Sequence, residues 1–369
     1  MRRGSLPALT GIRFVAAMQV VFYHYGSSFA ARHHFPRPIA VCLGNGWTAV
    51  TLFFLLSGLI LSYTYADNID GKTKRRRFWQ ARFARIYPVY FLSLLLALPF
   101  ALGSPQNSAT VHNAFQAGSV LLMVQAWNPL RPSDAQLWNF PAWTLSTEAF
   151  FYLLFPFILP LLQKASLRTL KALCIALLLL IIFGHTMTDV SGYYESVLHL
   201  PLPLIRFPEF VLGATAGVHF LRFGPVRKAA WLATVSIALI VLLESSVQGK
   251  WISLLALPFV TLLYCLAGNG GVWTRIFSTK ALILLGGASY SIYLLQDPVR
   301  MWTHRIVNPA NTDGGIDQWV SPLVLVAFSI AVFLWWEEPA RRWLREAFRS
   351  RPRRGPAEFP KIAESGETS

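Results

Sequence analysis

The chain has 369 residues, of which 54% are hydrophobic and only 14% charged, and its formal net charge at pH 7 is +16. Soluble domains carry about 25% charged residues, so this composition excludes a chain of two or three soluble domains and predicts a polytopic membrane protein. In a soluble protein such a charge would indicate nucleic acid as a partner. Here it is better explained by basic segments on the cytoplasmic side of a bilayer, so we expect no nucleic acid.

Ten apolar blocks are long enough to be transmembrane helices, which need about 20 residues each. They are residues 7–29, 46–66, 86–103, 142–162, 171–187, 203–221, 229–247, 251–267, 281–303 and 319–337. An eleventh candidate at 109–127 is shorter and carries His112, Asn113, Gln116 and Gln125. The sequence predicts an all-α polytopic membrane protein of about ten transmembrane helices, with a re-entrant or interfacial helix near 109–127.

The distribution of lysine and arginine sets the expected orientation. With ten crossings and a cytoplasmic N-terminus, 25 of the 33 basic residues lie in segments on the inner side. If 109–127 crossed the bilayer, the cluster Lys164, Arg168 and Lys171 would become external, against the positive-inside rule. We therefore expect a multi-pass protein of the inner (plasma) membrane with both termini cytoplasmic, consisting of a membrane domain at 1–337 and a basic cytoplasmic tail at 338–369. We also expect the first block to be a retained helix and not a cleaved signal peptide, because Arg13, Gln19 and His24 interrupt it.

Ionisable residues inside the first block indicate function, since such side chains are costly in lipid. Arg13 and His24 are 11 residues apart, which places them on one helix face about 16 Å apart along the axis. Arg13 would lie in the inner half of the membrane and His24 near the outer end. The alternatives are that Arg13 extends to the inner headgroups and that His24 makes a helix-packing hydrogen bond.

Three other spans carry polar residues, each with a structural explanation beside the functional one. Asn139 precedes the run Trp143 to Glu148, in which Ser146 could bond the helix backbone. Glu209 could form an i,i+3 ion pair with Arg206. The run Ser289 to Pro298, which includes Tyr290 and Gln296, is also typical of tight packing between membrane helices.

The segment before the third block is strongly basic. Seven lysines and arginines lie between residues 67 and 85, including Arg75, Arg76, Arg77, Arg82 and Arg85. A topology signal explains part of this charge. The remainder suits a polyphosphate ligand. Neither a phosphate-binding glycine loop nor a metal-ligand spacing is present, and Cys42, Cys174 and Cys265 follow no disulfide or zinc pattern, so we expect no metal site.

The ordered motifs of the chain resemble those of the acyltransferase-3 family of integral membrane acyltransferases. The similarity runs from residues 9–14 and 22–24 through 49–58, 82–88, 143–152 and 289–295 to 338–342, and so covers nearly the whole chain. The resemblance implies transfer of an acyl group, often acetyl, from cytoplasmic acyl-CoA to a carbohydrate hydroxyl, as in exopolysaccharide or O-antigen modification. It also implies the stand-alone form without an appended esterase-like domain. The family often has histidine where this chain has Gln296, which puts proton transfer at that position in doubt.

These observations together predict the roles of the site residues. The catalytic pair would be His24 as general base and Glu148 as the group that orients it. The acyl donor would bind Arg13, Arg75, Arg76, Arg77, Arg82 and Arg85, and the acceptor would bind Asn139, Trp143, Ser146, Glu209, Tyr290 and Gln296. Acetyl-CoA or another acyl-CoA would be a substrate, with no permanently bound cofactor, and the partners would be a glycan or lipid-linked sugar and membrane lipids. We expect direct transfer, with an acyl-enzyme on His24 or Ser146 as the alternative. The other functions considered are a transporter of a glycan or lipid-linked substrate and a non-catalytic scaffold.

Overall fold

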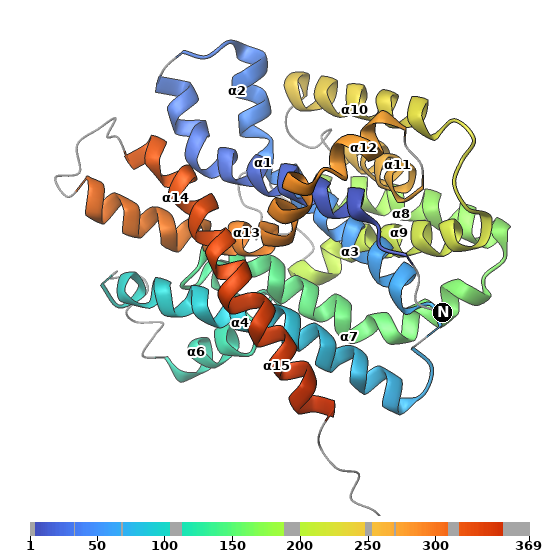
Figure 1. The fold of residues 1–369 in the computed structure, drawn as a ribbon, viewed down its shortest axis with the longest axis horizontal. Coiled ribbons are helices and arrows are strands. Elements are labelled where there is room, and N and C mark those ends of the chain that lie inside the picture. Colours follow the sequence, from blue (N-terminus) through green and yellow to red (C-terminus); the bar gives the residue numbers. More distant parts are fainter. Residues whose placement is uncertain are drawn as a thin grey trace, which may run out of the picture.

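A computed structural model describes residues 4–32, 34–67, 69–103, 113–187, 200–247, 253–268, 271–308 and 317–349, and every structural statement below refers to these residues. Within them the chain forms helices and turns and no β-strand (Figure 1). The prediction of an all-α membrane protein is confirmed.

Ten helices of the described chain correspond to the ten predicted blocks. They are α1 (Pro7–Arg32), α3 (Ala49–Tyr65), α4 (Lys72–Gly103), α7 (Trp143–Lys164), α8 (Leu167–Met187), α9 (Leu202–Phe223), α10 (Ala229–Ser246), α11 (Ala256–Ala267), α13 (Lys280–Val307) and α14 (Asp317–Val332). Seven described helical segments are long and apolar enough to cross a membrane, and these include every helix of the ten except α1, α11 and α13. Helices α1 and α13 have sufficient length but carry the polar residues singled out above, whereas the apolar segment Ser253–Ala267 is short.

The described part of the 109–127 candidate does not cross the bundle. Its described part holds α6 (Ala114–Leu121), whose eight residues extend only about 12 Å, while residues 109–112 lie outside the described chain. Helices α4 and α7 on either side of it run antiparallel: Trp79 contacts Tyr152, and Ser93 contacts Asn139. The chain therefore enters α7 from the end of the bundle at which α4 finished, as ten crossings require.

The polypeptide before α7 is inserted into the bundle. It contains the short helices η2 (Pro132–Gln136) and η3 (Phe140–Ala142). Asn139 is fully buried, and its amide nitrogen donates to Ser93 Oγ (3.0 Å) and to the carbonyl oxygen of Leu294 (3.1 Å) in the middle of α13. That carbonyl lacks its helical donor because Pro298, four residues later, has no N–H. Irregular backbone is tolerated at membrane depth where protein buries it in this way, and α7 consequently begins deep within the bundle.

A second proline inside a helix is compensated similarly. Pro156 in α7 leaves the carbonyl of Tyr152 without its i+4 donor. The indole N–H of Trp79 in α4 donates to that oxygen across 3.0 Å. The bond ties α4 to α7 beside the residues of the candidate site.

Glycines allow two pairs of helices to approach closely. A Cβ atom on Gly58 of α3 would collide with the α9 backbone, and one on Gly213 or Gly217 of α9 would collide with α3. A Cβ on Gly11 of α1 would meet the carbonyl of the chain preceding α13, and one on Gly286 of α13 would meet the α1 backbone. Small residues at such positions permit the backbone contact on which packing in membranes depends.

The basic segment before the third block is helical from Lys72, so α4 begins well before the apolar block predicted from residue 86. Lysine and arginine are good helix formers, and α4 continues them into the apolar span without a break. Its 32 residues correspond to about 48 Å, well beyond the ~30 Å of a bilayer core. The arginines of this segment are therefore held at fixed positions on a helix.

The C-terminal helix also extends past its predicted boundary. After α14 the chain forms one π-helical turn, η5 (Phe333–Glu337), and continues directly as α15 (Glu338–Arg349). Figure 1 shows α15 lying across α4, where Phe348 contacts Phe83. Residues 338–349 thus pack on the membrane domain, and residues 350–369 of the predicted tail lie outside the described chain.

Candidate active site

We call the end of the bundle at which α1 begins the inner end, in keeping with the expected orientation. Near it, side chains from α1, α4 and α15 form what we call the inner arginine cluster. Electrostatic interactions connect its members, directly or through Glu337, and the members are Arg13, Arg82, Arg85, Arg341 and Arg345.

Glu148 faces this cluster. Its carboxylate accepts a hydrogen bond from the Tyr152 hydroxyl (2.8 Å), and that hydroxyl lies 3.0 Å from Ser57 Oγ. Arg13 and Arg85 both interact electrostatically with Glu148. The predicted catalytic carboxylate therefore lies at the level of Arg13.

A second carboxylate, that of Glu337, also interacts with the cluster. It is 2% exposed, accepts from Ser291 Oγ (2.8 Å) and interacts with Arg85, Arg341 and Arg13. It ends the π-helical turn η5. Such turns insert one extra residue per turn into a helix and are frequent at functional sites.

The arginines predicted to bind the donor divide into two groups. The Arg75 guanidinium lies over the Phe157 ring (4.7 Å), and Arg82 lies over Tyr65 and donates to its hydroxyl (3.2 Å). Arg76 and Arg77 project from the opposite side of α4 and are exposed. Helical periodicity separates them, since successive residues turn by about 100°.

Basic groups outnumber acidic ones at the inner end. The five arginines of the cluster face three carboxylates, those of Glu148, Glu337 and Glu338. The Nε atoms of Arg13, Arg82, Arg341 and Arg345 are buried and make no hydrogen bond to the described chain. Surplus guanidinium donors of this kind suit a ligand with several phosphate oxygens.

His24 lies farther along α1, toward the outer end. Its ring packs edge-on against Phe140 (centroids 5.2 Å apart) and against Tyr23 (5.0 Å). The charged groups that interact with it are Asp297 and Arg300 of α13. His24 and Glu148 therefore lie in different surroundings within the described chain, because the inserted segment before α7 places Phe140, and not Glu148, at the level of His24.

The residues predicted to bind the acceptor do not form one cluster. Trp143 packs against Phe54 and Ser146 Oγ accepts from the Ala126 amide (3.1 Å). Tyr290 lies toward the inner end and donates to the carbonyl of Ile86 (2.7 Å). Asn139 binds the α13 backbone as described above. The amide nitrogen of Gln296 donates to Tyr293 O (2.8 Å), while its buried oxygen has no hydrogen-bond partner in the described chain.

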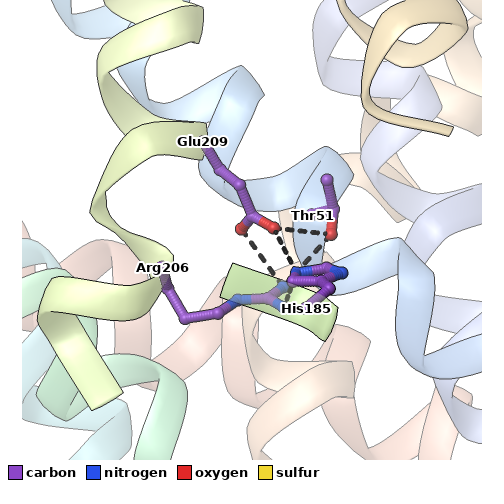
Figure 2. Close-up of polar contacts among 4 residues, drawn as sticks. All are labelled: Thr51, His185, Arg206 and Glu209. Carbon is purple, nitrogen blue, oxygen red and sulfur yellow. Dashed lines mark hydrogen bonds and ion pairs between the residues drawn. The ribbon is translucent and has the colours of Figure 1, made fainter. Parts of the chain in front are cut away.

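Glu209 belongs to a separate polar network, which Figure 2 shows. It forms the expected i,i+3 ion pair with Arg206 (3.1 Å) and accepts from Thr51 Oγ1 (3.0 Å). Arg206 also bonds Thr51 (3.1 Å) and lies 2.8 Å from His185 Nε2. All four side chains are buried. The intrahelical pair is thus part of an outer network that joins α3, α8 and α9.

The sequence-based prediction missed three buried ionisable residues. Glu337, His185 and Glu244, whose carboxylate accepts from Thr48, are buried ionisable residues in spans. The cost of a charge in lipid applies to them as it does to Arg13 and would have found all three. The electrostatic interaction of Asp297 with His24 depends on the packing of two helices far apart in sequence, and no local pattern indicates it.

Comparison with known proteins agrees with the motifs. The acyltransferase-3 family model, described as an acyltransferase domain, matches residues 6–336. The acyltransferase MdmB of Streptomyces mycarofaciens is 30% identical over 329 residues, covering 82% of this chain and 81% of that protein. The O-acetyltransferase OatA of Staphylococcus aureus is 24% identical over 327 residues, which are 80% of this chain and only 50% of OatA. No solved structure matches.

Three findings lead to the same assignment. They are a family match over nearly the whole chain, two acyltransferase relatives, and a helical bundle with several helices long and apolar enough to cross a membrane. The chain belongs to the acyltransferase-3 family and is an integral membrane O-acyltransferase.

Proposed function

We propose that this enzyme transfers an acyl group, acetyl in the first instance, from cytoplasmic acyl-CoA to a hydroxyl of a glycan or lipid-linked sugar on the other side of the membrane. It would reside in the plasma membrane with both termini cytoplasmic. The observation that carries the proposal is the placement of Arg13 and His24 on one helix, one in the inner arginine cluster and the other beside Phe140 nearer the outer end.

The donor would bind with its nucleotide phosphates at the inner end. Phosphates are costly in lipid, and the cluster offers guanidinium donors that the protein leaves unused. Arg82 and Arg85 lie on α4, and Arg13 of α1 interacts electrostatically with Arg85. Glu148 and Glu337 offset part of the repulsion between these arginines, and bound phosphates would offset the remainder. The extended thiol arm would then reach up the bundle toward His24.

The acceptor would approach from the outer end. As its hydroxyl oxygen attacks the thioester carbon, the hydroxyl proton moves to His24, a C–O bond forms and the C–S bond breaks. The protonated imidazole returns that proton to the CoA thiolate, and the products are an O-acyl ester and free CoA. The oxygen of Gln296 is a further group of this region that could accept from a substrate hydroxyl.

The test is acyl transfer by the purified full-length protein in proteoliposomes with radiolabelled acetyl-CoA and glycan acceptors. Replacing His24 with alanine is expected to lower kcat at least about a hundredfold, the usual contribution of a general base. His219, bonded to Tyr264 through a 2.9 Å contact, provides the matched control, and His219→Ala should retain activity.

Full transfer by correctly folded His24→Ala would exclude the proposed base. Movement of the glycan across the membrane without incorporation of label would favour the transporter instead. Acylated protein trapped in the absence of acceptor would contradict direct transfer.

A further inference from the structure

We propose that Asp297 is the positioning carboxylate of His24, in the place that the sequence assigned to Glu148. The inference rests on the proposed role of His24 as general base. It concerns a residue in the outer half of α13 that the predicted site does not include.

The packing of α1 against α13 brings the two residues to one level. The two helices run parallel: Thr10 of α1 lies against Gly286, and fifteen residues later the Tyr25 hydroxyl donates to the backbone carbonyl of Gln296 across 2.6 Å. Tyr25 follows His24 in sequence and Gln296 precedes Asp297, so this buried bond fixes the relative height of His24 and Asp297.

The charge environment supports the same pairing. Among the titratable groups of the described chain, Asp297 and Arg300 are the two that interact electrostatically with His24. Phe140 and Tyr23 cover the ring with aromatic edges, which carry no formal charge. Asp297 is therefore the nearby acid that can favour the protonated imidazole.

Asp297 also has a competing partner. Its carboxylate forms an i,i+3 ion pair with Arg300 (2.9 Å), in which the arginine side chain is 50% exposed and the aspartate 13% exposed. Because the arginine end is half exposed, solvent screens the pair and it contributes little to stability. The pair engages Asp297 Oδ1, and Arg300 reduces the negative field of the carboxylate at His24.

The chemistry gives this field a role in catalysis. When the hydroxyl proton of the acceptor moves to His24, the imidazole becomes a cation until it protonates the leaving thiolate. A fixed carboxylate at this level stabilises that cation electrostatically. This role requires no proton exchange by Asp297.

The experiment compares Asp297→Asn, Asp297→Glu and Arg300→Gln in the full-length protein, with kcat and donor KM measured separately. Asp297→Asn is expected to lower kcat about 10- to 100-fold and to leave the donor KM within about twofold, since the donor phosphates lie at the other end. Asp297→Glu, which keeps the charge, should recover most of the rate. Arg300→Gln should match or exceed the parent rate, because it removes the competing cation.

Two results would overturn the inference. One is normal kcat for Asp297→Asn while His24→Ala is inactive, which rejects Asp297 and leaves the proposed base intact. The other is an equal loss in Asp297→Asn and Arg300→Gln, which would assign the effect to their ion pair. If His24→Ala itself were active, the proposed function would fail first.

Discussion

The Tyr25 hydroxyl and the Gln296 carbonyl, 2.6 Å apart, join α1 to α13 at the outer end of the bundle. At the inner end Gly11 and Gly286 allow the same two helices to touch backbone to backbone. The pair is therefore held at both ends, and it carries Arg13 and His24 on one helix and Tyr290 and Asp297 on the other. Such a rigid pair can keep a donor site and a reaction site at a constant separation.

The arginines of α4 should contribute unequally to donor binding. Arg85→Gln is expected to raise the KM for acetyl-CoA about tenfold or more, because a charge-assisted contact to phosphate is lost. Arg76→Gln should change it less than twofold, since that side chain is exposed on the other side of α4. Steady-state kinetics in proteoliposomes at one fixed salt concentration measures both. Equal effects of the two substitutions would indicate a diffuse surface potential in place of a built phosphate site.

The hydrogen bond from Trp79 to the Tyr152 carbonyl replaces the backbone donor that Pro156 lacks, and this replacement can be tested. Trp79→Phe should destabilise the protein by about 1–3 kcal/mol, the cost of a buried carbonyl without a donor. Pro156→Ala supplies the missing backbone N–H, so it should cost less stability in the Trp79→Phe background than in the parent protein. Thermal unfolding of the four proteins in one detergent gives the coupling. Additive changes would show that the indole acts only through its packing.

Features that depend on one segment of the chain could be predicted from the sequence, whereas contacts between distant segments could not. Hydropathy located the ten helices that correspond to the predicted blocks, because burial in lipid acts on every residue of a segment independently. It also identified Arg13, His24 and Glu148 as residues that need partners. The partner of each residue depends on the depth at which its helix lies in the bundle. The inserted segment around Asn139 sets the depth of α7, and this segment has no hydropathy signal. For the same reason Glu148 was expected beside His24, whereas it lies with Arg13.

The contact between α3 and α9 should be sensitive to a single methyl group. Gly213→Ala places a Cβ against the carbonyl of Leu55, and the two helices must separate to admit it. We expect a loss of about 1–3 kcal/mol, typical of overpacking, and a lower thermal midpoint. Gly118→Ala in α6 is the control, because nothing lies within 4 Å of its Cβ position and alanine is the better helix former. A parent-like midpoint for Gly213→Ala would show that the α3–α9 contact is looser than described.

The outer network of Thr51, His185, Arg206 and Glu209 should act as a structural unit, distinct from catalysis. Removing one charge leaves the other buried without its partner, so Arg206→Met is expected to destabilise the protein by about 3–5 kcal/mol. Arg206→Met with Glu209→Met removes both charges and should be more stable than Arg206→Met alone. The network holds α3, α8 and α9 together, so the double variant should also keep a donor KM close to that of the parent. Thermal unfolding and acetyl-CoA kinetics on the same preparations separate the two roles. A double variant that unfolds normally but loses kcat would move Glu209 from the structural network to the acceptor site, where the sequence first placed it.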